Sequence, residues 1–381
     1  MEAVTEWTYK GVPENPSGWL FKVAKNKALN IVNRDKYKRR YASDIAHYLK
    51  SEWTADPALD LFFSEHEILD DQLRMMFTCC HPSISSDSQV ALTLKTLCGF
   101  SIPEIAHAFL TSEDTINKRL VRARQKIRDA NISFEVPQGI ELEKRASTVL
   151  EAIYLLFNEG YKASGGNDLV RYELCEEAIR LAEIILSHPV IHHKESIYAC
   201  LALMLLNASR FRARQDDKGN ILTMAEQDRS LWDRSLVEKG FYCLEKATTG
   251  NTISVYHILA AISGYHCSAP DFESTDWKSI LSLYDKLLQI DDSPLVLLNR
   301  AIAVSKVVGV AEAIKELEQI ENDPAIASYH LFYSTKAELH IQANQFAKAN
   351  DNLKKAIYFS RLEAEKKLLG KKLEACNEKI I

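Results

Sequence analysis

The side chains with the clearest potential chemistry in this chain are amides and cations gathered between positions 113 and 128. In the major groove of DNA, asparagine can pair with adenine and lysine with guanine, whereas arginines also hold phosphates. The cations of this cluster have no acid among them; they are Lys118, Arg119, Arg122, Arg124, Lys126 and Arg128. Because a charge run is most often a solvated helix face, the elements around the cluster must decide its role.

Three capping boxes, in which a serine or threonine precedes a polar partner by three residues, organise this segment. The pairs are Ser86 with Gln89, Ser101 with Glu104, and Thr111 with Asp114. Gly99 fits the end of the first helix, and residues 110–112 fit a tight turn. We therefore predict a long helix, a short helix and a basic helix, which together form a helix-turn-helix. A helical hairpin with a solvated basic face is the alternative.

The third helix of this unit would carry the DNA contacts. Ile116, Leu120, Ala123 and Ile127 form an apolar stripe that leaves the basic side chains outside. In a helix-turn-helix the first residues of the second helix meet base edges, and later cations meet phosphates. The candidate base contacts are Glu113, Asp114, Thr115, Asn117 and Lys118, and the candidate phosphate contacts are Arg119, Arg122 and Arg124.

The first seventy residues divide by charge. Residues 10–50 carry ten Lys or Arg against three acids, whereas residues 51–71 carry seven acids and no Lys or Arg. Asn15 and Pro16 fit a helix start, and aromatic side chains such as Trp19 lie among the cations. Aromatic rings among cations suit single-stranded bases, although Trp19 fits a core position equally well. We interpret 51–71 as an acidic linker.

The whole chain has ordinary globular composition: 381 residues, 46% hydrophobic and 26% charged, with a formal net charge of −5. This excludes a disordered chain, a collagen-like fibre and a disulfide scaffold. Eight scattered cysteines indicate reduced thiols, and no apolar run is long enough for a bilayer, so we expect a cytoplasmic protein that spans no membrane. Helical periodicity throughout predicts an all-α fold.

Beyond Pro137 the pattern is a long helical region, residues 138–381. Small residues recur near its end at tetratricopeptide-like intervals; they are Ala337, Ala349 and Ala356, with Ala301 and Ala313 repeating the first interval upstream. The tetratricopeptide period is about 34 residues, and the spacing here is 36. We predict a tetratricopeptide-like helical array, with a generic helical solenoid as the alternative.

Several of these segments resemble extracytoplasmic-function sigma factors. Residues 12–30 (VPENPSGWLFKVAKNKALN) resemble the latter part of domain two, and residues 71–137, with FSIPEIA at 100–106 and LVRARQKI at 120–127, look like domain four. FNEGY at 157–161 and EQDRSLWD at 226–233 resemble the subgroup with a large tetratricopeptide-like C-terminal domain. The matches fall in the family's order along essentially the whole chain.

The resemblance implies a promoter-specificity subunit of bacterial RNA polymerase core, with a partial domain two at 1–50 and domain four at 72–137. Domain four would read the minus-thirty-five element as duplex promoter DNA. Domain two would help to open the minus-ten region by capturing a flipped base, which is binding work, so we expect neither an enzyme nor a cofactor. The candidate contacts to the minus-ten region are Asn15, Trp19, Lys22, Lys25, Asn26 and Arg34.

The sequence departs from the family at its start. Family members begin with additional helices before the segment that contains Trp19, and these helices supply most of the contact with the polymerase clamp. Met1 falls at what looks like the end of the clamp-binding helix. We therefore expect this chain to bind core polymerase poorly.

Polar residues in apolar helical surroundings suggest a regulatory pocket for an unidentified ligand or protein. They are Asn158, Glu159, Tyr161, Arg210, Gln227, Asp228, Arg229, Trp232 and Asp233. A buried hydrogen-bond network that ties helices together is the favoured alternative. Arg210, Arg212 and Arg214 could bind an anion or cap carbonyls at a helix C-terminus. We expect no metal site, because Cys79, Cys80 and His81 are adjacent and have no second ligand cluster nearby.

Two rival functions remain open from the sequence. One is an autonomous DNA-binding regulator that uses only the helix-turn-helix. The other is a degenerate sigma-like adaptor or sensor, in which the DNA-binding parts have decayed. A footprint without polymerase would favour the first, and loss of DNA affinity with retained partner binding would favour the second.

Overall fold

The computed structural model describes residues 70–129, 137, 139–165 and 169–380. Within these ranges the fold consists of fifteen α-helices, two short 3-10 helices and no strand apart from one isolated bridge between Gln215 and Ile221. The prediction of an all-α protein is confirmed. The partial domain two and most of the acidic linker, residues 51–71, lie outside the described residues.

Four helices form the first part of the described chain. They are α4 (Asp71–Cys79), α5 (Ser86–Thr96), α6 (Ile102–Ala108) and α7 (Glu113–Asp129). Asp70, placed in the linker by its charge, caps α4 by accepting the Leu73 N–H at 2.9 Å. Cys79 and Cys80 are buried at the end of α4 before Pro82, as small apolar residues would be.

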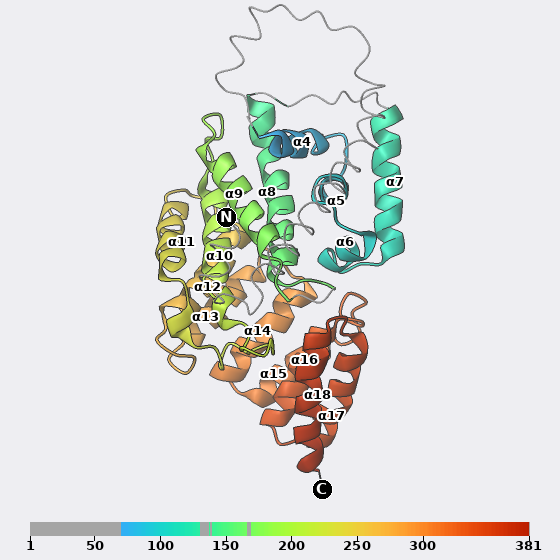
Figure 1. The fold of residues 1–381 in the computed structure, drawn as a ribbon, viewed down its shortest axis with the longest axis vertical. Coiled ribbons are helices and arrows are strands. Elements are labelled where there is room, and N and C mark those ends of the chain that lie inside the picture. The colour runs from blue at the N-terminus through green and yellow to red at the C-terminus, as the bar shows by residue number, and fades with distance from the viewer. Residues whose placement is uncertain (1–69, 130–136, 138, 166–168, 381) are drawn as a thin grey trace, which may run out of the picture. The chain divides into compact units, whose positions relative to one another are not determined.

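The next helices continue the same hydrophobic core. They are α8 (Ile140–Tyr161), α9 (Tyr172–Ser187) and α10 (Glu195–Ala208), and α8 contacts α4, α5 and α6 (Figure 1). One cluster of buried apolar side chains runs from Leu73 to Ala260 and includes Ile116 of α7 and Leu142 of α8. The expected boundary at 137 therefore falls within a single core.

A close helix approach fixes α8 against α9. A Cβ on Gly160 would lie 2.7 Å from the Cys175 sulfur and 2.9 Å from the Arg171 carbonyl oxygen. Only glycine fits this approach without displacing a helix. The FNEGY segment at 157–161 therefore has a packing function at its glycine.

The middle of the chain connects through short elements to three further helices. The elements are η2 (Phe211–Ala213), η3 (Arg229–Leu231), α11 (Arg234–Ala247), α12 (Val255–Ser268) and α13 (Trp277–Leu287). Helices α11 and α12 pack on α10, and α12 also packs on α13. Asp233 caps α11 through the Leu236 N–H, at 3.1 Å.

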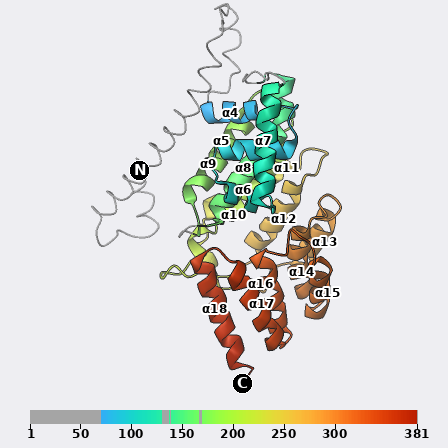
Figure 2. The same cartoon turned by 90° about the vertical axis from the view of Figure 1, so that its right-hand side faces the viewer.

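Five helices complete the chain, and we call them the C-terminal array. They are α14 (Pro294–Val307), α15 (Val310–Ile320), α16 (His330–Gln342), α17 (Phe346–Phe359) and α18 (Glu363–Glu378). Figures 1 and 2 show α16, α17 and α18 packed side by side. The five alanines singled out by their spacing are all fully buried; they are Ala301, Ala313, Ala337, Ala349 and Ala356. They let the paired helices approach closely, as predicted.

Candidate DNA-binding site

The turn between α6 and α7 sets where the basic helix begins. The predicted box at the start of α6 is confirmed: Ser101 N–H donates to Glu104 at 2.5 Å, and Glu104 N–H donates to the Ser101 hydroxyl at 3.3 Å. At the other end, Leu110 has φ of +46°, which reverses the chain. Its N–H bonds to the His107 carbonyl, and the Thr111 N–H bonds to the Ala106 carbonyl. This is the Schellman arrangement that ends a helix.

That arrangement explains why the predicted cap at Thr111 is wrong. The Thr111 N–H completes the end of α6, so α7 starts one residue later than the sequence pattern indicated. Ser112 is the cap instead: its hydroxyl accepts the Thr115 N–H at 3.2 Å, and its carbonyl accepts the Ile116 N–H at 3.2 Å. Asp114 consequently points outward and is exposed.

The predicted box at Ser86 is also wrong. Ser85 is the N-cap of α5, and its hydroxyl bonds to the Ser88 hydroxyl at 2.9 Å. Gln89 is buried and donates to the carbonyls of His81 and Ile84, at 2.9 and 2.6 Å, rather than reaching the cap N–H. Burial of the glutamine beside two open carbonyls outweighs the local capping pattern.

The N-terminal end of α7 is polar and open. Glu113, Asp114, Asn117 and Lys118 are exposed, and Thr115 is half-buried. Lys118 pairs with Asp114 at 2.6 Å, with both side chains well over half exposed. Such a surface pair contributes only about 0.5 kcal/mol, so both side chains remain free to turn toward a ligand.

The arginines expected to hold phosphates differ in their surroundings. Arg122 is exposed and Arg124 is half-buried. Arg119 pairs with Asp87 of α5 at 3.0 Å, and its guanidinium lies over the Phe109 ring at 5.4 Å. Arg119 therefore positions α7 against α5, a contact that the sequence analysis did not anticipate. Its role at phosphates stays a prediction.

The candidate contacts to single-stranded DNA lie outside the described residues. They are Asn15, Trp19, Lys22, Lys25, Asn26 and Arg34.

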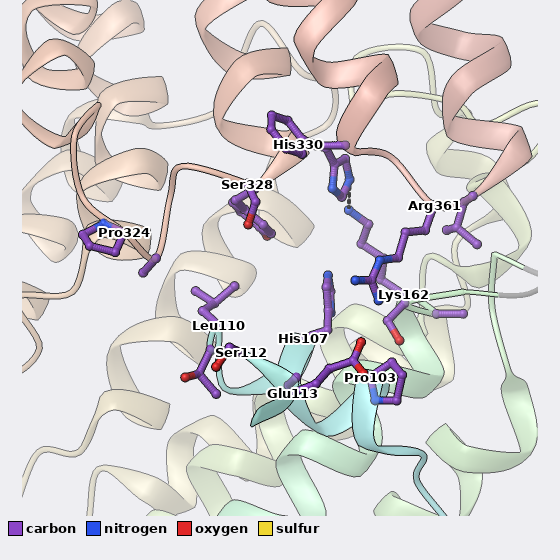
Figure 3. Close-up of a pocket in the computed structure, with 18 of the residues that line it drawn as sticks. Pro103, His107, Leu110, Ser112, Glu113, Lys162, Pro324, Ser328, His330 and Arg361 are labelled. Carbon is purple, nitrogen blue, oxygen red and sulfur yellow. Dashed lines mark hydrogen bonds between the residues drawn. The ribbon is translucent and has the colours of Figure 1, made fainter. Parts of the chain in front are cut away.

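A cavity of about 710 Å³ adjoins the start of α7 (Figure 3). Residues 103–113 line one side, from α6 through the turn to Glu113. The opposite sides come from residues 162–164 after α8, the segment 323–330 before α16, and residues 359–365 between α17 and α18. The start of α7 and the C-terminal array thus share one cavity.

An ion-pair cluster, Lys162 with His330 and Glu365, holds the wall of this cavity together. Lys162 Nζ lies 2.9 Å from one Glu365 oxygen, and His330 Nε2 lies 3.0 Å from the other. The Ser360 hydroxyl also donates to Glu365, at 2.9 Å. Nearby, Leu362 packs against Leu169 and Val170. The start of α18 is therefore docked on the segment that follows α8.

No local pattern in the sequence marks the residues that line the cavity. His107, Lys162, His330, Arg361 and Glu365 come from four separate segments and meet only in the folded chain. FNEGY ends one residue before Lys162, and this was the nearest signal in the sequence.

The first part of the suspected regulatory pocket is a hydrogen-bonded helix end. Glu159 is buried and accepts from the Ser164 N–H and hydroxyl at 3.0 and 3.2 Å. Asn158 hydrogen-bonds Tyr154 one turn earlier. Tyr161 lies under the Arg214 guanidinium at 3.9 Å, and Arg214 donates to the Tyr161 carbonyl. Arg214 thus caps the end of α8, one of the two roles expected for these arginines.

The second part surrounds Trp232. Arg210 and Arg229 lie over its ring at 5.5 and 4.7 Å, and Arg210 donates to Gln227 at 3.2 Å. Asp228 is exposed and caps η3, as Asp233 caps α11. The contacts found here tie segments together, which is the network interpretation. Trp232 Nε1 and Arg229 Nη2 are buried with no partner among the described residues, so the cluster can still donate to a further acceptor.

Within the described ranges, no group of three or more His, Cys, Asp or Glu side chains is arranged to hold a metal ion. The Cys79 and Cys80 thiols lie 3.9 Å from the hydroxyls of Thr96 and Thr93. Burial raises the pKa of Cys79 to about 11, so the thiol stays protonated. Over the same ranges no helix combines the length and apolar character needed to cross a bilayer.

The geometry and the family matches agree on the class of protein. Residues 74–127, from α4 to α7, match the family described as "Sigma-70, region 4", and residues 145–248 match a family of unknown function, DUF6596. The first match and the open end of α7 define a sigma-factor-like DNA-binding protein.

One relative matches almost the whole chain. The uncharacterized protein R00370 of Rhizobium meliloti (strain 1021) is 33% identical over 357 residues, which cover 94% of this chain and 83% of that protein. The chain belongs to the same family as that protein. No solved structure matches this chain.

Proposed function

We propose that this chain is an extracytoplasmic-function RNA polymerase sigma factor that acts in the cytoplasm on promoter DNA and core polymerase. In this proposal α7 reads the minus-thirty-five element, and residues 1–50 contact the minus-ten region. The observation that carries the proposal is the exposed polar end of α7 inside the segment that matches "Sigma-70, region 4". The work is binding and base capture, so no catalytic group is required.

We further propose that the tetratricopeptide-like C-terminal array regulates access to DNA. Ser112 and Glu113 at the start of α7 line the same cavity as residues 323–330 of the array. A duplex that reached the base-reading end would meet these residues. DNA binding would therefore require the array to move away from the turn.

Run-off transcription with purified bacterial core polymerase tests the main proposal. Because we expect weak binding to core polymerase, the assay uses core and this chain at saturating concentrations; a selected template should then yield a transcript that depends on this chain, and Asn117→Ala should reduce it. Arg234→Gln, which changes an exposed arginine on α11, serves as the control and should leave the transcript unchanged. A duplex footprint without polymerase, combined with no chain-dependent transcript, would instead support an autonomous regulator.

A substitution tests regulation by the array more cleanly than truncation. Removing everything after 137 would strip α8 from the core that it shares with α5, so loss of DNA binding would follow from unfolding. Glu365→Gln loosens the ion-pair cluster at the cavity while the helix-turn-helix stays whole. We expect this variant to bind duplex DNA more tightly. Equal or weaker binding in a folded variant would contradict regulation by masking.

A further inference from the structure

The cavity beside α7 has the size of a small-molecule site. Its volume of about 710 Å³ lies within the range of roughly 300–1,000 Å³ that is typical of ligand pockets. It is walled by parts of the chain that are distant in sequence, so an occupant would touch the helix-turn-helix and the C-terminal array together (Figure 3).

Several groups that line the cavity are hydrogen-bond donors without an acceptor among the described residues. Arg361 is exposed at the cavity and makes no hydrogen bond or ion pair with any described residue. The Tyr329 hydroxyl likewise has no hydrogen-bond partner among the described residues. Burial raises the pKa of Tyr329 to about 12, so its hydroxyl keeps its proton at neutral pH.

Lys162 also has an N–H that is available to donate a hydrogen bond to a ligand. His330 Nε2 lies 3.0 Å from Glu365 and 3.3 Å from Lys162 Nζ. A single ring nitrogen cannot donate to the carboxylate and accept from the ammonium at once. When it donates to Glu365, one N–H of Lys162 is left without an acceptor. The acceptor oxygens of Glu365 are meanwhile occupied by Lys162, His330 and Ser360.

His107 lines this cavity together with the cationic side chains of Lys162 and Arg361. Burial, and after it the neighbouring Lys162, His330 and Arg361, together lower the pKa of His107 to about 4 against an opposing effect of Glu365. Figure 3 shows Lys162, Arg361 and His107 directed toward the same space. A neutral imidazole can donate one hydrogen bond to an anion.

We propose that this cavity is a binding site for a small oxyanion, a molecule that carries a phosphate or carboxylate group. Arg361 and Lys162 hold the charged group, and His107 and Tyr329 donate to it. Leu110 to Glu113, on the same side of the cavity as His107, contact the rest of the molecule. The occupant bridges the array and the turn before α7. If the proposed function holds, the bound molecule therefore stabilises the arrangement in which the array covers the start of α7. It then weakens DNA binding, and DNA weakens binding of the molecule by the same factor.

Isothermal titration calorimetry of the full chain tests the site without DNA. Pyrophosphate is the phosphate probe and citrate the carboxylate probe, and the arm that binds identifies the source of the oxyanion. We expect saturable binding of at least one probe, with shifts of the His107 ring resonances in NMR spectra. Arg361→Gln should weaken that binding at least tenfold. Arg234→Gln removes an exposed arginine elsewhere and should leave the affinity unchanged.

The outcomes separate this site from the proposed function. Failure of both probes to bind wild type saturably overturns the site, as does equal affinity in Arg361→Gln. If neither probe binds wild type and Arg361→Gln loses affinity for duplex DNA, this arginine contacts the DNA backbone. That result would also overturn the proposed oxyanion site. Probe binding that depends on Arg361 supports the site even if the chain fails in transcription. Arg361 has no partner among the described residues, so its substitution should leave the fold intact.

Discussion

The carboxylate of Glu365 offers a prediction whose magnitude can be worked from the structure. Its side chain is only 10% exposed, between Lys162 at 2.9 Å and His330 at 3.0 Å. Burial alone would raise the pKa of Glu365. The hydrogen bond from His330 and the positive charge of Lys162 outweigh burial and lower the pKa from 4.5 to about 2. The folded state therefore favours the ionised carboxylate.

This lowered pKa sets both the size and the sign of the effect. The difference between 4.5 and about 2 corresponds to roughly 3 kcal/mol of folding free energy at neutral pH. Because the folded pKa of Glu365 is the lower one, this stabilisation is fully present above about pH 4.5. It is lost progressively as the pH falls toward 2. Glu365→Gln removes it and leaves Lys162 without its carboxylate.

Urea unfolding followed by circular dichroism measures the effect. At pH 7 we expect Glu365→Gln to lower the free energy of unfolding by about 2–3 kcal/mol. Glu363→Gln is the matched control on the same helix: Glu363 is 80% exposed and pairs with Lys366 one turn away. Its substitution should cost less than about 0.5 kcal/mol.

Acid pH supplies the second part of this test. The difference in free energy of unfolding between wild type and Glu365→Gln should fall by more than half between pH 7 and pH 3. A gap that stays constant over this range would refute the reasoning, and so would equal stability of the Glu365→Gln and Glu363→Gln variants at pH 7.

Three further predictions follow from local geometry. Ser112→Ala should cost about 1 kcal/mol in urea unfolding and Thr111→Ala less, because the Ser112 hydroxyl caps α7; the reverse order would contradict the cap. Gly160→Ala should cost about 1–3 kcal/mol in thermal unfolding, because its Cβ would meet the Cys175 sulfur at 2.7 Å, and an unchanged midpoint would argue against this contact. Arg122→Ala should reduce the salt dependence of duplex binding, measured by fluorescence anisotropy, by about one charge, and an unchanged slope would speak against a phosphate contact.

Periodicity was sufficient to predict the helical parts of the fold. The stripe containing Ile116 and Leu120 is buried in the core, and Ala337 and Ala349 are buried between paired helices, as their spacing indicated. These features repeat with the helical turn, so each residue's own neighbourhood in sequence carries the signal.

Capping was predicted less well, because adjacent serines and threonines compete for one position. Ser85 and Ser112 are the N-cap residues of α5 and α7, one residue away from the expected caps at Ser86 and Thr111. The choice at Thr111 depends on the positive φ of Leu110, a conformation that leucine rarely adopts and that the sequence therefore does not indicate.

The cavity could not have been predicted from local patterns. Lys162 and Arg361 are separated by about two hundred residues and come together only because the C-terminal array docks near the end of α8. The candidate base contacts lie on α7, where all of them except the half-buried Thr115 are exposed. Their contacts with DNA remain predictions.

The central claim is that the exposed end of α7 reads the sequence of duplex DNA. Selection from a random duplex pool by the full chain together with core polymerase tests it most directly, with wild type and Asn117→Ala compared on the same pool. We predict one enriched motif for wild type, and a preference in Asn117→Ala that is relaxed at one base by roughly 1–3 kcal/mol. No enriched motif for wild type, or the same motif with the same preferences in Asn117→Ala, would contradict the claim.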